Sequence, residues 1–266
     1  GTGGVSGTGG VSGTGGVSGT GGVSGTGGVS GTGGVSGTGG SGGGGTDACS
    51  DALGGLAAGF ESGASGFTHA ALDGVSGSWP FDEWAVGATS LAPGGCHGGS
   101  ACFGTNLNKN YAQCSRAALA SRAIDLSACA GTDLKLVFWH FHSFWQGSYG
   151  GRPYADGGAV ELSGDGGSTW TATSSGNGTL AINPDMGASY ACLKSTSFHV
   201  NGLSGFVGTS GGWERVEIPI PPALRTATFR ARFVWSSGVS SKTTSAESSR
   251  QGTAPGWYID DVSIEK

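Results

Sequence analysis

The first 46 residues contain only glycine, threonine, valine and serine, and this tract limits what the chain can fold into. Six copies of GTGGVS run from residue 1 to residue 36, and GTGG, a serine and a glycine run follow. The tract has almost no apolar side chains whose burial can offset the conformational entropy that ordering costs. We therefore divide the chain into a low-complexity repeat, residues 1–46, and a globular domain, residues 47–266.

Glycine stands at every third position of the repeat, which makes a G-X-Y pattern. A polyproline-type helix has three residues per turn and no internal hydrogen bonds, so its bare glycine edge can pair only with neighbouring chains. We therefore predict a collagen-like or polyglycine-II-like assembly stalk, although the tract lacks the proline that stiffens collagen. A flexible linker and a β-type repeat are the alternatives. The predicted assembly glycines are Gly1, Gly4, Gly7, Gly10, Gly13, Gly16, Gly19 and Gly22.

The charge and hydropathy of the chain exclude two kinds of partner. With 13 basic and 18 acidic side chains, there is no basic excess to hold a nucleic-acid backbone. No apolar run approaches the roughly 18 residues that a membrane span needs. No basic segment followed by an apolar stretch is present either, so we expect a mature secreted product, extracellular or on the cell surface.

The globular part reads as strands separated by glycine, serine, asparagine and proline clusters. Residues 115–123 are the exception, and there we expect one or two helical turns. Strands with long loops in a domain of this size predict an all-β fold, an antiparallel two-sheet jelly-roll sandwich. The expected strands are residues 134–142, 158–163, 215–220, 228–235 and 257–264.

An ordered set of motifs carries a family resemblance. It comprises FESGASGFTH at 60–69, taken as the opening strand, IDLS at 124–127, DGGAVELS at 156–163, DGGSTW at 165–170 and GWYIDDVSI at 256–264. The set resembles the MAM-like, concanavalin-type jelly-roll modules of bacterial secreted proteins, and is similar to the accessory β-domain of immune-inhibitor-A-type metallopeptidases. The resemblance covers about residues 57–266, and the insertions at 94–116 and 171–212 depart from it. It implies a two-sheet sandwich with adjacent first and last strands and no catalytic role.

The resemblance also implies calcium at an acidic cluster that joins those two strands. The candidate ligands are Glu61, Asp156, Asp260 and Asp261. If the last strand is regular, Asp260 and Asp261 point to opposite faces and only one enters the sheet edge or core. Calcium takes six to eight oxygen ligands. The alternative is that one aspartate caps a loop by hydrogen bonds while the other is solvated.

Two further motifs have mainly structural interpretations. SGDGGSTW at 163–170 fits the Asp-box pattern, in which Asp165 accepts turn N–H groups and Trp170 packs beneath. His140 and His142 alternate along a strand and so share one face, as in strand-borne zinc sites. Since no third ligand stands at a readable spacing, we expect two histidines on a polar sheet face instead. The jelly-roll modules that the chain resembles tend to carry an aromatic-histidine pattern in this strand, and that resemblance favours packing.

Six cysteines, an even number without CxxC, favour three disulfides over zinc in a secreted chain. We expect Cys96–Cys102 as a local pair and Cys49 as the tie between the stalk junction and the domain. The full set is Cys49, Cys96, Cys102, Cys114, Cys129 and Cys192.

Loop aromatic residues are the candidate ligand-binding groups. Trp145, Tyr149 and Tyr154 can stack on sugar rings, but they are equally suited to anchoring loops or to a subunit interface. Glu161 is a carboxylate of the kind glycosidases use, yet no partner carboxylate can be named. HExxH and a phosphate-binding loop before a helix are missing, so we expect no enzyme.

Together these features predict a structural subunit of a secreted bacterial surface filament or appendage. It would form homo-oligomers through the repeat, with the jelly roll as a head or bead. The alternative is a carbohydrate-binding or adhesive module on a flexible tether.

Overall fold

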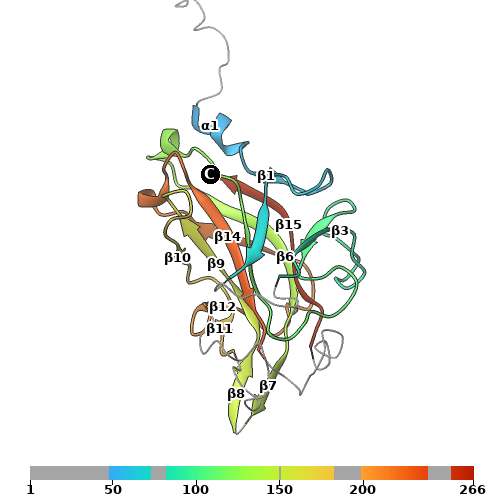
Figure 1. Cartoon of the computed structure of the whole chain (residues 1–266). Helices are drawn as coiled ribbons and strands as arrows, with labels where there is room; N and C mark the ends of the chain where they lie inside the picture. Colours follow the sequence, from blue (N-terminus) through green and yellow to red (C-terminus); the bar gives the residue numbers. More distant parts are fainter. Residues whose placement is uncertain (1–47, 73–81, 150, 183–198, 239–252) are drawn as a thin grey trace, which may run out of the picture. The chain divides into compact units, whose positions relative to one another are not determined.

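The computed structural model, drawn in Figure 1, describes residues 48–72, 82–149, 151–182, 199–238 and 253–266. The chain divides into two units, residues 1–47 and 48–266. The predicted stalk with its assembly glycines, and also Cys192, lie outside the described residues. The fold below is that of the second unit.

The second unit is an antiparallel jelly-roll sandwich of two large sheets, as predicted. We call the first the β6 sheet, and its strand order is β13-β6-β15-β4-β3, with β1 beside β15. These strands are β13 (Glu214–Pro219), β6 (Lys135–Ser143), β15 (Gly256–Glu265), β4 (Cys102–Gly104), β3 (Ala85–Gly87) and β1 (Ala57–Ala58). Ala57 pairs with Ser263, so the first and last strands are adjacent, as the resemblance implied.

We call the second the β9 sheet, and its order is β11-β12-β9-β14-β5-β2, with β10 beside β9. Its strands are β11 (Gly178–Thr179), β12 (Ser204–Val207), β9 (Gly157–Ser163), β14 (Arg230–Ser236), β5 (Arg116–Ala120), β2 (Thr68–Ala71) and β10 (Thr171–Ala172). A separate hairpin of β7 (Gln146–Tyr149) and β8 (Arg152–Ala155) lies at the end of the sandwich opposite α1 (Ala48–Leu53) (Figure 1). The described residues of this unit also form two short 3-10 turns, η3 (Ser127–Cys129) and η5 (Pro222–Leu224).

Alternate residues of the long strands face the interior because side chains alternate along a strand. Phe138 of β6 meets Phe233 of β14 edge to face, with ring centroids 4.9 Å apart, and Trp257 of β15 contacts Phe233 at 5.7 Å. The five strands that the sequence predicts are all present, within two residues at each end. Among the described residues, no helix is long and apolar enough to span a bilayer.

The histidine pair of β6 lies in this interior, so the expected polar sheet face is wrong. His140 and His142 do share one face, but that face packs against Phe206 and Trp257. The Trp257 indole donates to His140 Nδ1 at 3.0 Å. Burial lowers the pKa of His140 to about 3 and that of His142 to about 4, so both rings are neutral at pH 7.

Two local expectations are also wrong. Residues 115–123 contain the buried strand β5, which pairs with β14 and β2, instead of helical turns. Its alanines are helix formers, but their small side chains also fit a central strand, and sheet pairing decides between the two. The predicted opening strand, 60–69, is a series of turns up to Phe67, because Phe60 and Ser65 have positive φ values of 60° and 50°.

The described residues contain one local disulfide and one that joins distant parts of the sequence. Cys96–Cys102 is the expected local pair, and Cys49–Cys129 ties α1 to η3 across 80 residues of sequence. Cys114 is also disulfide-bonded. Cys49 thus fastens the start of the described domain to its body, where the Lys266 ammonium also donates to Ser50 Oγ at 3.1 Å.

Candidate functional site

The outer face of the β6 sheet has a covered half and an open half. The segment between β3 and β4 packs Ala92 onto Phe141 and Tyr258 and so covers one half. The other half is an open groove of about 410 Å³. The groove residues used below are Val137, Trp139, Arg215, Asp261, Ser263 and Glu265.

The register of three strands forms the groove floor. Trp139 of β6 lies opposite Arg215 of β13, and Val137, two residues earlier, lies opposite Ser263 of β15. The Trp139 side chain is half-buried, although tryptophan usually lies deep in a fold of this kind. The groove therefore presents one large aromatic ring among short and polar side chains.

Ion pairs cross the open face. The Arg215 guanidinium contacts Glu217 of its own strand and reaches past β6 to Glu265 of β15 at 2.6 Å. The Lys135 ammonium contacts Glu217 at 3.0 Å. Such exposed pairs contribute little to stability, and they gather the charged side chains along the groove.

A β-bulge carries both C-terminal aspartates to one loop. The register of β15 against β6 shifts between Asp260 and Ser263, and Asp261 has a left-handed φ of 47°. The Gly98 N–H donates to Asp260 Oδ2 at 3.0 Å, and His97 Nδ1 lies 2.8 Å from Asp261 Oδ2. The premise of a regular strand is therefore wrong here, since the extra residue turns the second carboxylate toward the same loop.

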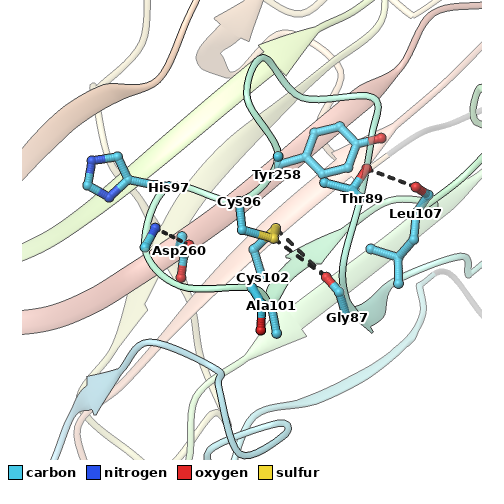
Figure 2. Close-up of a disulfide and its surroundings, with 12 residues drawn as sticks. Gly87, Thr89, Cys96, His97, Ala101, Cys102, Leu107, Tyr258 and Asp260 are labelled. Atoms are coloured by element: carbon cyan, nitrogen blue, oxygen red, sulfur yellow. Dashed lines mark hydrogen bonds between the residues drawn. A yellow bond between two sulfur atoms is a disulfide. The ribbon is translucent and has the colours of Figure 1, made fainter.

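That loop, residues 96–102, is closed by a disulfide (Figure 2). The Gly87 carbonyl oxygen lies 3.6 Å from Cys96 Sγ on one side, and Asp260 lies on the other. Glu61 fixes the far end of the loop, because its carboxylate accepts the Ser100 N–H at 2.9 Å and the Ala101 N–H at 3.3 Å. The Ser100 N–H lowers the pKa of Glu61.

Three of the four predicted calcium ligands thus meet at one loop, but their contacts do not fit a calcium site. The oxygens of Glu61 and Asp260 accept N–H groups, which repel a cation. Within the described ranges, the one group of three possible ligands with mutually close ligand atoms is Cys96, Cys102 and Asp260, and both its sulfurs are in the disulfide. Loop capping, the alternative, matches the hydrogen bonds of Asp260. Calcium binding stays a prediction.

Asp156, the fourth predicted ligand, lies apart from this loop and is buried. Its carboxylate accepts the Tyr111 hydroxyl at 2.8 Å and the Gly238 N–H at 2.7 Å. Burial raises its pKa to about 7. The Tyr111 hydroxyl in turn accepts the Trp145 N–H at 2.8 Å, so Asp156 anchors the base of the β7–β8 hairpin.

The predicted aromatic residues lie on or beside that hairpin. Trp145 is half-buried and packs against the main core, and its indole leaves no room for a side chain at Gly147. Tyr154 is half-buried on β8, opposite Gly147. Tyr149 pairs with Arg152 near the hairpin tip. Sugar binding by these three residues stays a prediction.

The Asp-box forms the turn that its pattern predicts. Asp165 accepts the Thr169 N–H at 2.9 Å and the Thr169 hydroxyl at 2.6 Å, which lower its pKa, and Gly167 has a φ of 97°. The Arg232 guanidinium lies 4.3 Å from the Trp170 ring centroid. The motif therefore fastens a hairpin at the edge of the β9 sheet.

Glu161 contacts a histidine and an arginine. Its carboxylate lies 2.7 Å from His199 Nε2 and 3.2 Å from Arg232 Nη2, and its side chain is only 3% exposed. The hydrogen bond with His199 and the charge of Arg232 outweigh burial and lower its pKa. This pairing differs from the two facing carboxylates of a glycosidase.

Sequence reasoning missed Trp139, His97 and Arg215 as site residues. Trp139 stands inside an apolar strand, where aromatic residues usually pack in the core. Its alternation with His140 and His142 does place it on the opposite face from them. Which face is open depends on the loops that cross the sheet, and strand alternation carries no information about those loops.

Comparisons with known proteins find structural similarity only at low sequence identity. No protein-family model matches the chain, and no curated protein matches it. The chain is similar to the solved structure of the carbohydrate-binding module CBM27-1 of Caldicellulosiruptor saccharolyticus in complex with mannohexaose, at 13% identity and a TM-score of 0.36. The similarity covers 78% of this chain and 94% of that module. The strand pairing alone shows that the described part of the chain is a β-sandwich of the jelly-roll type.

Proposed function

We propose that residues 48–266 bind carbohydrate through the groove on the β6 sheet. The carrying observation is the half-buried Trp139 on the floor of an open groove of about 410 Å³. An aromatic ring offers a flat apolar surface of the size of a sugar ring, and binding sites combine such surfaces with a few placed polar groups. The proposal selects the tethered binding module over the filament subunit.

The groove also offers the polar groups that sugar hydroxyls need. Asp261, Ser263 and Glu265 follow one another on β15 at the same groove, and Arg215 faces them from β13. Carboxylates accept hydrogen bonds from hydroxyls, and the guanidinium donates to ring and hydroxyl oxygens. The contacts of Arg215 with Glu217 and Glu265 place its guanidinium beside the groove.

The charge of the groove favours neutral glycans. Both cations beside the floor, Arg215 and Lys135, already contact glutamates. Asp261 adds a further carboxylate to the groove. An acidic sugar would meet these carboxylates and would find each cation already engaged, which costs affinity.

Affinity electrophoresis tests the proposal. The protein is run in native gels that contain soluble mannan, xylan or mixed-linked β-glucan, with an acidic polysaccharide for comparison. Retardation by at least one neutral polysaccharide is expected. Trp139→Ala should weaken it about tenfold or more, since a central tryptophan dominates a small binding surface.

Two tryptophan variants are matched controls. Trp170→Ala changes a ring on the other sheet, and Trp145→Ala changes the ring at the hairpin base. Both should keep the retardation of the unmodified protein. Loss with Trp145→Ala but not with Trp139→Ala would move the site to the hairpin, and no retardation of the unmodified protein in any gel would contradict the proposal.

The remaining expectations are proposals of the same kind. An extracellular location is supported by the disulfides, which persist in oxidising compartments. Binding without catalysis is our expectation for the groove. The filament hypothesis rests on residues 1–46, outside the described residues, and electron microscopy of the full chain tests it, because assembly through the repeat predicts regular fibres.

A further inference from the structure

The covered and open halves of the β6 sheet meet at a stack of two rings. The imidazole of His97 lies on the Trp139 indole, with ring centroids 3.8 Å apart and an interplanar angle of 13°. Trp213 approaches the same imidazole edge-on at 5.9 Å, and its indole N–H donates to the Gly95 carbonyl at 3.1 Å. His97 is therefore in direct contact with the proposed sugar platform.

The backbone on both sides of His97 is held in place. The disulfide joins Cys96, the residue before it, to Cys102, and Asp260 accepts the N–H of Gly98, the residue after it. Asp261 contacts His97 Nδ1 at 2.8 Å. Glu61 holds the far end of the loop through the Ser100 N–H.

Two glycines allow the carboxylates to come this close. A Cβ at Gly98 would lie 2.9 Å from Asp261 Oδ2, and one at Gly99, whose φ is 59°, would overlap the Glu61 carboxylate. The backbone of the loop therefore lies close to carboxylates that accept hydrogen bonds from its N–H groups. A loop fixed in this way presents His97 at a constant position relative to β6.

We propose that His97 is a positioning residue for carbohydrate binding, because it holds the Trp139 indole in the orientation that a sugar ring needs. This inference rests on the proposed function of the groove. A half-buried tryptophan on an open sheet face can change rotamer, and freezing a side chain during binding costs affinity. The stack on His97 restricts the rotamers of Trp139 before a sugar binds. The disulfide loop in turn restricts His97.

The matched variants are His97→Ala, which removes the ring, and His97→Phe, which keeps a flat ring but loses the contact with Asp261. His69→Ala is the control, because His69 is an exposed histidine paired with Asp82, away from the groove. Each is compared in affinity gels and by fluorine NMR of protein labelled with 5-fluorotryptophan. Trp139→Phe assigns the Trp139 resonance among the eight tryptophans.

His97→Ala should shift or broaden the Trp139 resonance and weaken retardation by about two- to tenfold, the cost of ordering one side chain. His97→Phe should restore most of both signals, and His69→Ala should change neither. An unchanged Trp139 resonance in His97→Ala would overturn the positioning role. Tighter binding by that variant would also overturn it, because His97 would then be a cover on the platform.

The two proposals fail in different ways. The fluorine signal needs no glycan, so it reports the positioning of Trp139 even if no polysaccharide binds. If the unmodified protein binds and Trp139→Ala does not, while His97→Ala behaves like the unmodified protein in both measurements, the groove function stands and the role of His97 falls.

Discussion

Asp260 and Asp261 are consecutive residues, yet both carboxylates reach the same disulfide-closed loop. Asp260 accepts the Gly98 N–H, and Asp261 contacts the His97 imidazole. The bulge in β15 makes this possible, and Asp261 takes a left-handed φ of 47° to do so. A non-glycine residue in that region carries a conformational cost, which the two loop contacts offset.

The hydrogen bonds at this loop predict the response to calcium removal. Excess EDTA should leave the melting temperature unchanged, because N–H groups of the loop already occupy the oxygens of Glu61 and Asp260. Differential scanning calorimetry with and without added calcium makes the measurement. A fall of several degrees in EDTA that calcium reverses, and magnesium does not, would support the calcium prediction instead.

The two disulfides should differ in their effects. Replacing Cys49 and Cys129 by alanine should lower the unfolding free energy by about 4.5 kcal/mol, and replacing Cys96 and Cys102 should lower it by about 2 kcal/mol. The difference arises because a disulfide that closes a longer loop removes more conformational entropy from the unfolded chain. Urea titrations give both values. Only the Cys96/Cys102 variant should alter the Trp139 fluorine resonance, and equal changes in that resonance would argue against a specific link between the loop and the groove.

The raised pKa of Asp156 predicts that the unfolding free energy of the protein falls as pH rises. Its pKa is about 7 in the folded protein, above the ordinary value of 3.8. The folded state therefore holds its proton more tightly, and the stabilisation, complete below about pH 4, is lost as pH rises through 7. The difference between the two pKa values corresponds to about 4 kcal/mol of unfolding free energy.

Asp156→Asn removes this titration and keeps a similar shape. Relative to the unmodified protein, the variant should gain stability between pH 4 and pH 7.5 in urea titrations. A difference between the two proteins that does not change with pH would contradict burial of an ionisable carboxylate. Asp51→Asn, an exposed change on α1, is the control.

The lowered pKa of His142 predicts the opposite dependence, in which the unfolding free energy rises with pH. Its pKa is about 4 in the folded protein, below the ordinary value of 6.5. Above pH 6.5 both states are neutral. As pH falls below 6.5, the unfolded chain takes up the proton first, so the unmodified protein loses stability toward pH 4. His142→Gln should lack this loss, worth about 3 kcal/mol.

The measurement is the difference in unfolding free energy between His142→Gln and the unmodified protein from pH 7 to pH 4.5. The difference isolates His142 from the opposing slope of Asp156, which both proteins retain. A flat difference for His142→Gln would mean that water reaches the ring in the folded state.

The sequence alone determined the division at the repeat, the all-β class, five main strands, the Cys96–Cys102 pair and the Asp-box turn. These follow from local chemistry, because glycine content, period-two alternation and turn residues act over a few residues. The same alternation also placed His140 and His142 on one face.

Only the tertiary structure decided that His140 and His142 face the interior of the sandwich and what covers the opposite face of β6. Residues 116–120 form a strand because β14 and β2 flank them, against their helical propensity. Asp156 lies apart from Glu61 and Asp261, although the family resemblance implied that all three belong to one calcium site. Trp139 lines an open groove because the loop that carries His97 covers only part of the β6 sheet. Such long-range coverage is set by packing between distant segments, which local sequence does not encode.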